Sequence, residues 1–122
     1  TGATLNEADF RGADLRMAMF TESSAPRARF DLCQLEHALF DKADCQQASF
    51  AHARAPYTNF SHAKIDLADF TDANLQGALL HGASELETQF RGAFTLQLER
   101  SDEALKEAEN HRAPSLRPEL GA

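Results

Sequence analysis

The sequence lacks the features that identify membrane-spanning and nucleic-acid-binding proteins. No apolar run approaches the roughly 18 residues that a transmembrane helix needs, and no signal-peptide pattern opens the chain. The net charge is −7 and no block is rich in Lys and Arg, which argues against a surface that neutralises phosphates. For this single-domain chain of 122 residues we therefore expect neither membrane insertion nor direct nucleic-acid binding.

Motifs for catalysis and cofactor binding are also missing. The sequence has no phosphate-binding loop, no nucleophile elbow and no zinc-binding spacing. Its two cysteines, Cys33 and Cys45, match no metal motif. We therefore predict that the protein is not an enzyme and uses no cofactor.

A strict period of five residues organises most of the chain. Reading every fifth residue from Leu5 to Phe90 gives eighteen positions, of which seventeen are apolar and eight are Phe. Two places earlier, from Ala3 to Thr88, fourteen of the eighteen residues are Ala. No insertion breaks the count, so one structural unit repeats along the chain.

Neither a helix nor a straight strand keeps such a pattern on one face. Five residues of an α-helix turn through about 500°, which leaves successive Phe roughly 140° apart. On a strand, an odd repeat puts them on alternate sides. Both conflicts disappear if the chain turns a corner once in every repeat. The centre and the residue two before it then point inward, and Gly and polar residues such as Asn6, Gly12 and Gln76 form the corners.

The repeats resemble those of the pentapeptide-repeat family, whose consensus is approximately Ala-(Asp/Asn)-Leu-x-x. The segments 8–12 (Ala-Asp-Phe-Arg-Gly) and 73–77 (Ala-Asn-Leu-Gln-Gly) match it closely. The resemblance covers residues 3–92 and implies an all-β fold, a right-handed quadrilateral β-helix with four five-residue sides in each coil. Its structural core would contain two facing columns, which together hold Phe10, Phe20, Phe30, Phe40, Phe50, Phe60, Phe70, Leu80 and Phe90.

Three repeats fit the pattern poorly, at residues 23–27, 53–57 and 83–87. The first two place Pro after the centre, and Pro cannot donate a hydrogen bond to a neighbouring strand. The third puts Glu85 at an inward centre, where an unpaired charge is costly. We therefore predict a distorted last coil near Glu85, with Leu86 turned inward instead.

The regular count stops at about residue 94, where a helical spacing replaces it. Phe94, Leu98, Leu105 and Ala108 follow one another at spacings of 4, 7 and 3, which is typical of an amphipathic helix. Leu98 and Leu105 would contact the last coil or a second copy of the chain, which would make a homodimer through this helix. The predicted division is a β-helix of roughly 4.5 coils at 1–93, a C-terminal capping helix at 94–112 and an extended or disordered tail at 113–122.

The residues with reactive side chains have simple structural interpretations. His62 and His81 would lie on one side of adjacent coils, but solvated turn residues explain them better than a metal site. Cys33 and Cys45 would point inward from opposite walls as small core residues, which favours a reducing compartment. We therefore expect a cytoplasmic protein, with secretion as part of a larger effector as the alternative. Four acids that precede a centre are expected to bond the local backbone: Asp9, Asp14, Asp44 and Asp69.

One outward column is unusually apolar and is the candidate interaction stripe. On the wall whose centres include Phe20 and Phe40, the residues just before the centres include Met19, Leu39 and Leu79. Scattered exposed apolar residues are ordinary, but three in one column form a candidate contact surface. The column could equally pack against the chain's own C-terminal segment or against another domain.

Two functions remain open from the sequence. The apolar stripe favours a non-catalytic protein–protein interaction module of a larger bacterial protein, such as a secretion-system adaptor or effector. The chain opens inside its repeat with Thr1-Gly2-Ala3, as a piece of a longer protein would. The alternative is a DNA mimic that binds a type II topoisomerase (DNA gyrase), which the resemblance to quinolone-resistance pentapeptide proteins implies and the acidic charge favours. Against it, acids and bases are mixed on every wall and no projecting loop breaks the repeat.

Overall fold

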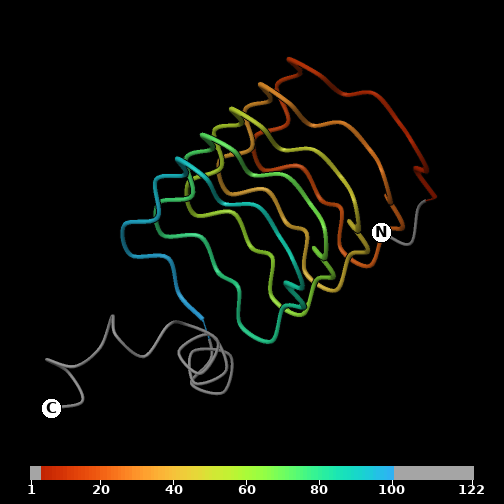
Figure 1. The fold of residues 1–122 in the computed structure, drawn as a ribbon. Helices are drawn as coiled ribbons and strands as arrows, with labels where there is room; N and C mark the ends of the chain where they lie inside the picture. The colour runs from red at the N-terminus through yellow and green to blue at the C-terminus, as the bar shows by residue number, and fades with distance from the viewer. Residues whose placement is uncertain (1–3, 101–122) are drawn as a thin grey trace, which may run out of the picture.

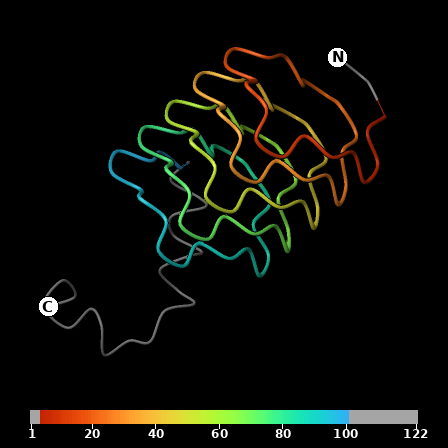
Figure 2. The same ribbon diagram turned by 90° about the horizontal axis from the view of Figure 1, so that it is seen from above.

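The protein is a four-sided coil, seen in a computed structural model that describes residues 4–100 (Figure 1). Sixteen parallel bridges, from Thr4↔Ser24 to Leu79↔Glu99, each join residues twenty positions apart. One coil therefore takes twenty residues, and each of its four walls takes five. The first and last coils lie at opposite ends of the stack, as the view from above also shows (Figure 2).

The described backbone consists of single-residue bridges and two-residue turns, with no helix and no longer strand between residues 4 and 100. It therefore offers no helix with the length and apolarity needed to cross a membrane. Four walls follow one another around the coil. Their inward centres are Leu5, Ala25, Cys45, Ile65 and Glu85 on wall A; Phe10, Phe30, Phe50, Phe70 and Phe90 on wall B; Leu15, Leu35, Ala55, Leu75 and Thr95 on wall C; and Phe20, Phe40, Phe60, Leu80 and Arg100 on wall D.

Each corner is a tight turn whose third residue has a left-handed backbone. At the corner after Phe30, the Cys33 amide donates to the Phe30 carbonyl at 3.1 Å, and Leu32 has a φ of 62°. A positive φ at this place is the mark of a type II turn. The Leu32 amide also donates to the carbonyl of Ala51 in the next coil, at 3.1 Å. The corner thus satisfies its own polar groups and joins the two coils.

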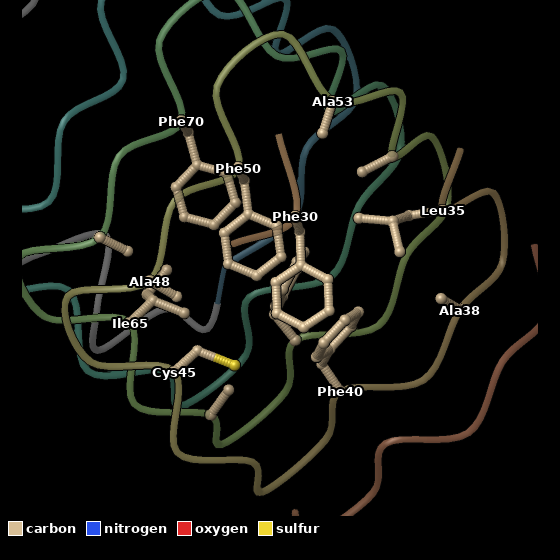
Figure 3. Packing of buried hydrophobic residues seen from close by; sticks show 14 of the residues in the cluster. Phe30, Leu35, Ala38, Phe40, Cys45, Ala48, Phe50, Ala53, Ile65 and Phe70 are labelled. Carbon is tan, nitrogen blue, oxygen red and sulfur yellow. The ribbon is translucent and has the colours of Figure 1, made fainter. Parts of the chain in front are cut away.

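The core contains two columns of Phe that face each other across the coil. Along a column the rings stack, with Phe30 and Phe50 centroids 4.9 Å apart. Across the coil they meet edge to face, with Phe30 and Phe40 centroids 5.3 Å apart at 89° (Figure 3). Both arrangements suit the ring quadrupole and add to the free energy of burial. Small residues on wall A, such as Ala25 and Cys45, leave room for the rings.

The two Pro-containing repeats are regular, which corrects the expectation that they are weak. Pro26 and Pro56 are the first corner residues, the second position of the turn, where a fixed φ near −65° is favourable. Their carbonyls accept bonds from the amides of Glu7 and His37, at 3.0 and 3.2 Å. The missing N–H of Pro does no harm because, in these turns, the amide at this place joins no neighbouring coil.

The last coil is not rearranged around Glu85, so the prediction that Leu86 turns inward is wrong. Leu86 is 71% exposed, while Glu85 keeps its inward place. Its carboxylate accepts hydrogen bonds from Arg100 Nε and Nη2, at 2.8 and 2.9 Å. The Arg100 guanidinium also lies 5.6 Å from the centroid of the Phe90 ring. Arg100, an inward centre on wall D, supplies the opposite charge that makes Glu85 tolerable at this position.

The capping helix predicted over 94–112 is wrong in its first residues, because 94–100 continue the coil. Phe94 and Glu99 bridge Asn74 and Leu79 in the coil before. Leu98, expected on a helix face, instead packs against the core from the inward Ala position. The preceding coil offers hydrogen-bond partners at once, whereas the first turn of a helix must form against unfavourable entropy. The rest of the predicted helix, with Leu105, and the tail at 113–122 lie outside the described residues.

Candidate interaction surface

The predicted interaction stripe is a continuous outward column on wall D. Bridges join Met19 to Leu39, Leu39 to Asn59 and Asn59 to Leu79, so these side chains stand one above another at about 4.8 Å intervals. Met19 is 64% exposed, and Leu39 and Leu79 are partly exposed. The column is therefore an accessible apolar strip, interrupted by the amide of Asn59.

A second column, at the corner between walls C and D, widens this strip. Met17 and Tyr57 lie two residues before outward positions of wall D and are 73% and 48% exposed. The ring of His37 lies between them in the column and stacks on Tyr57 with centroids 5.4 Å apart. Together the two columns form the wall D surface, which we define as Met17, Met19, Leu39, Tyr57 and Leu79.

The Tyr57 ring lies against Gly77 on the wall D surface. A Cβ added to Gly77 would lie 2.5 Å from Cε1 of Tyr57, so the ring covers the space that the glycine leaves. The stripe expected from the sequence leaves Tyr57 out, because corner residues were considered there only as turn formers. Reading the second corner position every twenty residues, which gives Met17, His37, Tyr57 and Gly77, would have found this column.

The far edge of wall D is polar. Thr21 Oγ1 donates to Asp41 Oδ1 at 2.8 Å, and His81 Nε2 lies 3.4 Å from a carboxylate oxygen of Glu99. His62, the other histidine considered for a metal, lies with its ring over Gly82. Among the described residues no three His, Cys, Asp or Glu side chains gather as metal ligands. An apolar strip with a polar margin is the usual anatomy of a protein interface.

The four outward acids accept hydrogen bonds from backbone amides at the corners, which confirms the predicted backbone role. Each accepts a hydrogen bond from the amide two residues later, at 2.9–3.2 Å: Asp9, Asp14, Asp44 and Asp69. The first two also form ion pairs, with Arg11 at 2.6 Å and Arg16 at 2.7 Å. The side-chain hydrogen bonds from these arginines lower the pKa of both carboxyls to about 2. They are therefore stably ionised and poorly suited to proton transfer near neutral pH.

Both cysteines are buried free thiols. Cys33 Sγ donates to the Phe10 carbonyl at 2.8 Å, and burial raises the pKa of both thiols above the usual value. Since the thiolate is the reactive form of cysteine, neither is disposed to act as a nucleophile. They serve instead as small members of the core.

Comparison with known proteins identifies the repeat. The family model for pentapeptide repeats matches eight copies, over residues 1–24, 28–66 and 68–94. No curated protein matches the chain. A solved pentapeptide repeat protein (Rfr23) from the cyanobacterium Cyanothece 51142 aligns with a TM-score of 0.60 and 17% identity, over 82% of this chain and 89% of its own. This likeness supports the fold, a right-handed β-helix, and nothing finer.

Two further solved structures align less well. A pentapeptide repeat protein from the Arabidopsis thaliana thylakoid lumen is 32% identical over 69% of this chain and 62% of its own, with a TM-score of 0.38. QnrB1, a plasmid-mediated fluoroquinolone resistance protein, is 15% identical over 90% of this chain and 83% of its own, with a TM-score of 0.39.

Proposed function

This chain belongs to the pentapeptide-repeat family, and on that basis we propose that it is a non-catalytic protein–protein interaction module. It acts as a domain of a larger bacterial protein, such as a secretion-system adaptor or effector. The β-helix serves as a rigid scaffold that presents one wall to a protein partner. Both cysteines are free thiols, which fits a reducing compartment, and we place the protein in the cytoplasm or in an effector exported from it.

The observation that carries this proposal is the wall D surface. Its apolar side chains come from adjacent coils and from two neighbouring columns, so they form one patch instead of isolated groups. Rigid stacking fixes their backbone positions before any partner arrives, which lowers the entropy lost on binding. Met and Tyr are also residue types enriched in protein interfaces. The patch therefore has the composition and the rigidity of a docking surface.

A pull-down from native bacterial lysate, read by mass spectrometry, tests the proposal. The first bait is the native chain, and the second carries Met19→Asp, Leu39→Asp and Leu79→Asp. We expect the native bait to retain a partner that the second bait loses, because three charges on an apolar contact prevent its desolvation.

The matched control bait carries Ser24→Asp, Gln34→Asp and Gln89→Asp. These residues occupy the same outward backbone position on other walls, and the substitutions add the same charge. Retention of the partner by this control supports the proposal. If all three baits recover the same proteins, or if none recovers any, the wall D surface is not a docking site.

The DNA-mimic alternative has less support in the charge distribution. A DNA mimic needs runs of negative charge, yet no outward column within residues 4–100 places acids in two adjacent coils. Two acids of the first coil, Asp9 and Asp14, are also neutralised by arginines. The pull-down discriminates here as well, since a gyrase subunit among the proteins lost with the wall D surface would favour the alternative.

A further inference from the structure

A hollow of about 500 Å³ lies on the outside of wall B, away from the wall D surface. Arg29 and Ser49 belong to the outward column of wall B. The preceding corner contributes Arg27 and Gln47 to the lining, and the following corner contributes Arg11 and Asp31.

The lining of this hollow is rich in arginine although the chain as a whole is acidic. It combines three guanidinium groups with the Asp31 carboxylate, and Asp9 and Glu7 beside the hollow pair with two of these guanidiniums. The remaining lining side chains are a hydroxyl and an amide, both of which can donate hydrogen bonds. Attraction of an anion to this site therefore depends on a guanidinium that no acid holds.

The three arginines differ in how many donors they have available. Arg11 is held by Asp9 through Nε and Nη2, at 2.9 and 2.6 Å. Arg27 donates Nε to Gln47 at 3.1 Å and lies 3.7 Å from a carboxylate oxygen of Glu7. Arg29 is exposed, and among residues 4–100 its side chain forms no hydrogen bond or ion pair, although its charge contributes slightly to lowering the pKa of Asp9. Its guanidinium is therefore the main donor available to a ligand.

We propose that this hollow binds a phosphate group. The planar fork of Arg29 suits bidentate contact with phosphate oxygens, and Arg27 and Ser49 lie on the same lining to complete the donor set. Asp31 opposes the anion and limits its affinity. Because the site is open to water, the attraction is partly screened, and we expect dissociation constants in the millimolar range.

A nuclear magnetic resonance titration of the full chain with inorganic phosphate tests this proposal. Ionic strength is held constant with sodium chloride, so that a specific shift is separated from screening. We expect saturable changes at the Arg29 Nε–H and at the backbone amides around the hollow. Arg29→Gln should weaken binding about tenfold, the usual effect of losing a charged hydrogen bond.

Arg54→Gln is the matched control, since Arg54 occupies the same outward position on wall C and is exposed. It should leave phosphate binding unchanged, and the spectra of both variants report whether the fold is retained. Shifts that do not saturate, or equal losses in the two variants, would overturn the proposal.

A second pair of titrations separates free phosphate from a phosphorylated side chain. The probes are a neutral three-residue peptide that contains phosphoserine and the same peptide with serine. Equal binding of the phosphopeptide and of inorganic phosphate supports a general phosphate site, and tighter binding of the phosphopeptide supports recognition of a modified protein. Equal responses to the two peptides, with none to inorganic phosphate, would contradict the proposal.

Discussion

The fold requires a left-handed backbone at the third residue of each turn, which is the second of its two corner positions. Fifteen non-glycine residues there have φ between 54° and 62°, and the other four positions hold Gly with φ between 67° and 74°. A non-glycine residue in this region costs on the order of 1 kcal/mol. Hydrogen bonds to the next coil, such as that of Leu32, offset the cost. Most residue types are therefore accepted at a corner.

Alanine substitutions at Gly77 and Gly12 can distinguish the free-energy cost of a left-handed backbone from the cost of displacing a neighbouring side chain. A Cβ added to Gly12 would meet nothing within 4 Å, whereas one on Gly77 would strike the Tyr57 ring. We expect Gly12→Ala to lower the free energy of unfolding by about 1 kcal/mol, and Gly77→Ala to lower it further by displacing the ring. Urea denaturation of both variants measures the difference. In a Tyr57→Ala background the two substitutions should cost the same, and a difference that persisted there would refute this account.

At the scale of one coil, the last coil ends the core with an ion pair. The side chains of Glu85 and Arg100 are 17% and 24% exposed, so they lie mostly inside, next to the partly buried Phe90. The coil before it has apolar centres throughout. The polar pair lets the core meet water at the C-terminal end of the described coils without leaving a charge unpaired.

Removing Arg100 tests whether this pair holds the last coil. Arg100→Met leaves the Glu85 carboxylate without its partner, and we expect a loss of about 1–3 kcal/mol of stability. The Leu80 amide, which donates to the Glu99 carbonyl at 2.7 Å, should exchange faster with solvent deuterium.

Arg91→Met, at an exposed corner of the same coil, is the control and should change stability by less than about 0.5 kcal/mol. A double substitution to Leu at positions 85 and 100 should restore protection, since an apolar pair can replace a buried ion pair. Equal effects of the two single substitutions would rule out a special role for the pair.

Across the whole molecule, stability is unevenly distributed along the rod. Each coil contacts only its neighbours, as in other solenoids, so the coils between two others bury most. Phe30, Phe40, Phe50, Phe60 and Phe70 are fully buried, whereas Phe10 and Phe90 in the end coils are partly buried. The middle coils therefore carry most of the apolar burial that stabilises the fold.

Alanine substitutions at Phe50 and Phe10 compare the contribution to stability of a middle coil with that of an end coil. Phe50→Ala leaves a cavity between the stacked rings of Phe30 and Phe70, and we expect it to cost about 3–5 kcal/mol. Phe10→Ala removes a ring that is only partly buried and has an aromatic neighbour in one adjacent coil, so roughly half that loss is expected. Urea denaturation followed by circular dichroism measures both. A larger loss for Phe10→Ala would show that the first coil, and not the middle, controls stability.

The five-residue period by itself predicted one corner in every repeat and the inward and outward positions, whereas the four walls and the Phe columns followed from the resemblance to the pentapeptide-repeat family. The period could do so because each repeat turns one corner, so a residue's place in the repeat settles the direction of its side chain. The backbone role of acids such as Asp44 and Asp69 followed from the same register, since their hydrogen bonds span only two residues.

Only the tertiary structure decided which side chains from different coils and walls meet. Arg100 reaches Glu85 from fifteen residues away, and Arg27 and Arg29 share a hollow with Arg11. The physical reason is distance along the chain: these contacts join residues of different coils or of neighbouring walls. The position of a residue in its five-residue repeat does not specify these contacts.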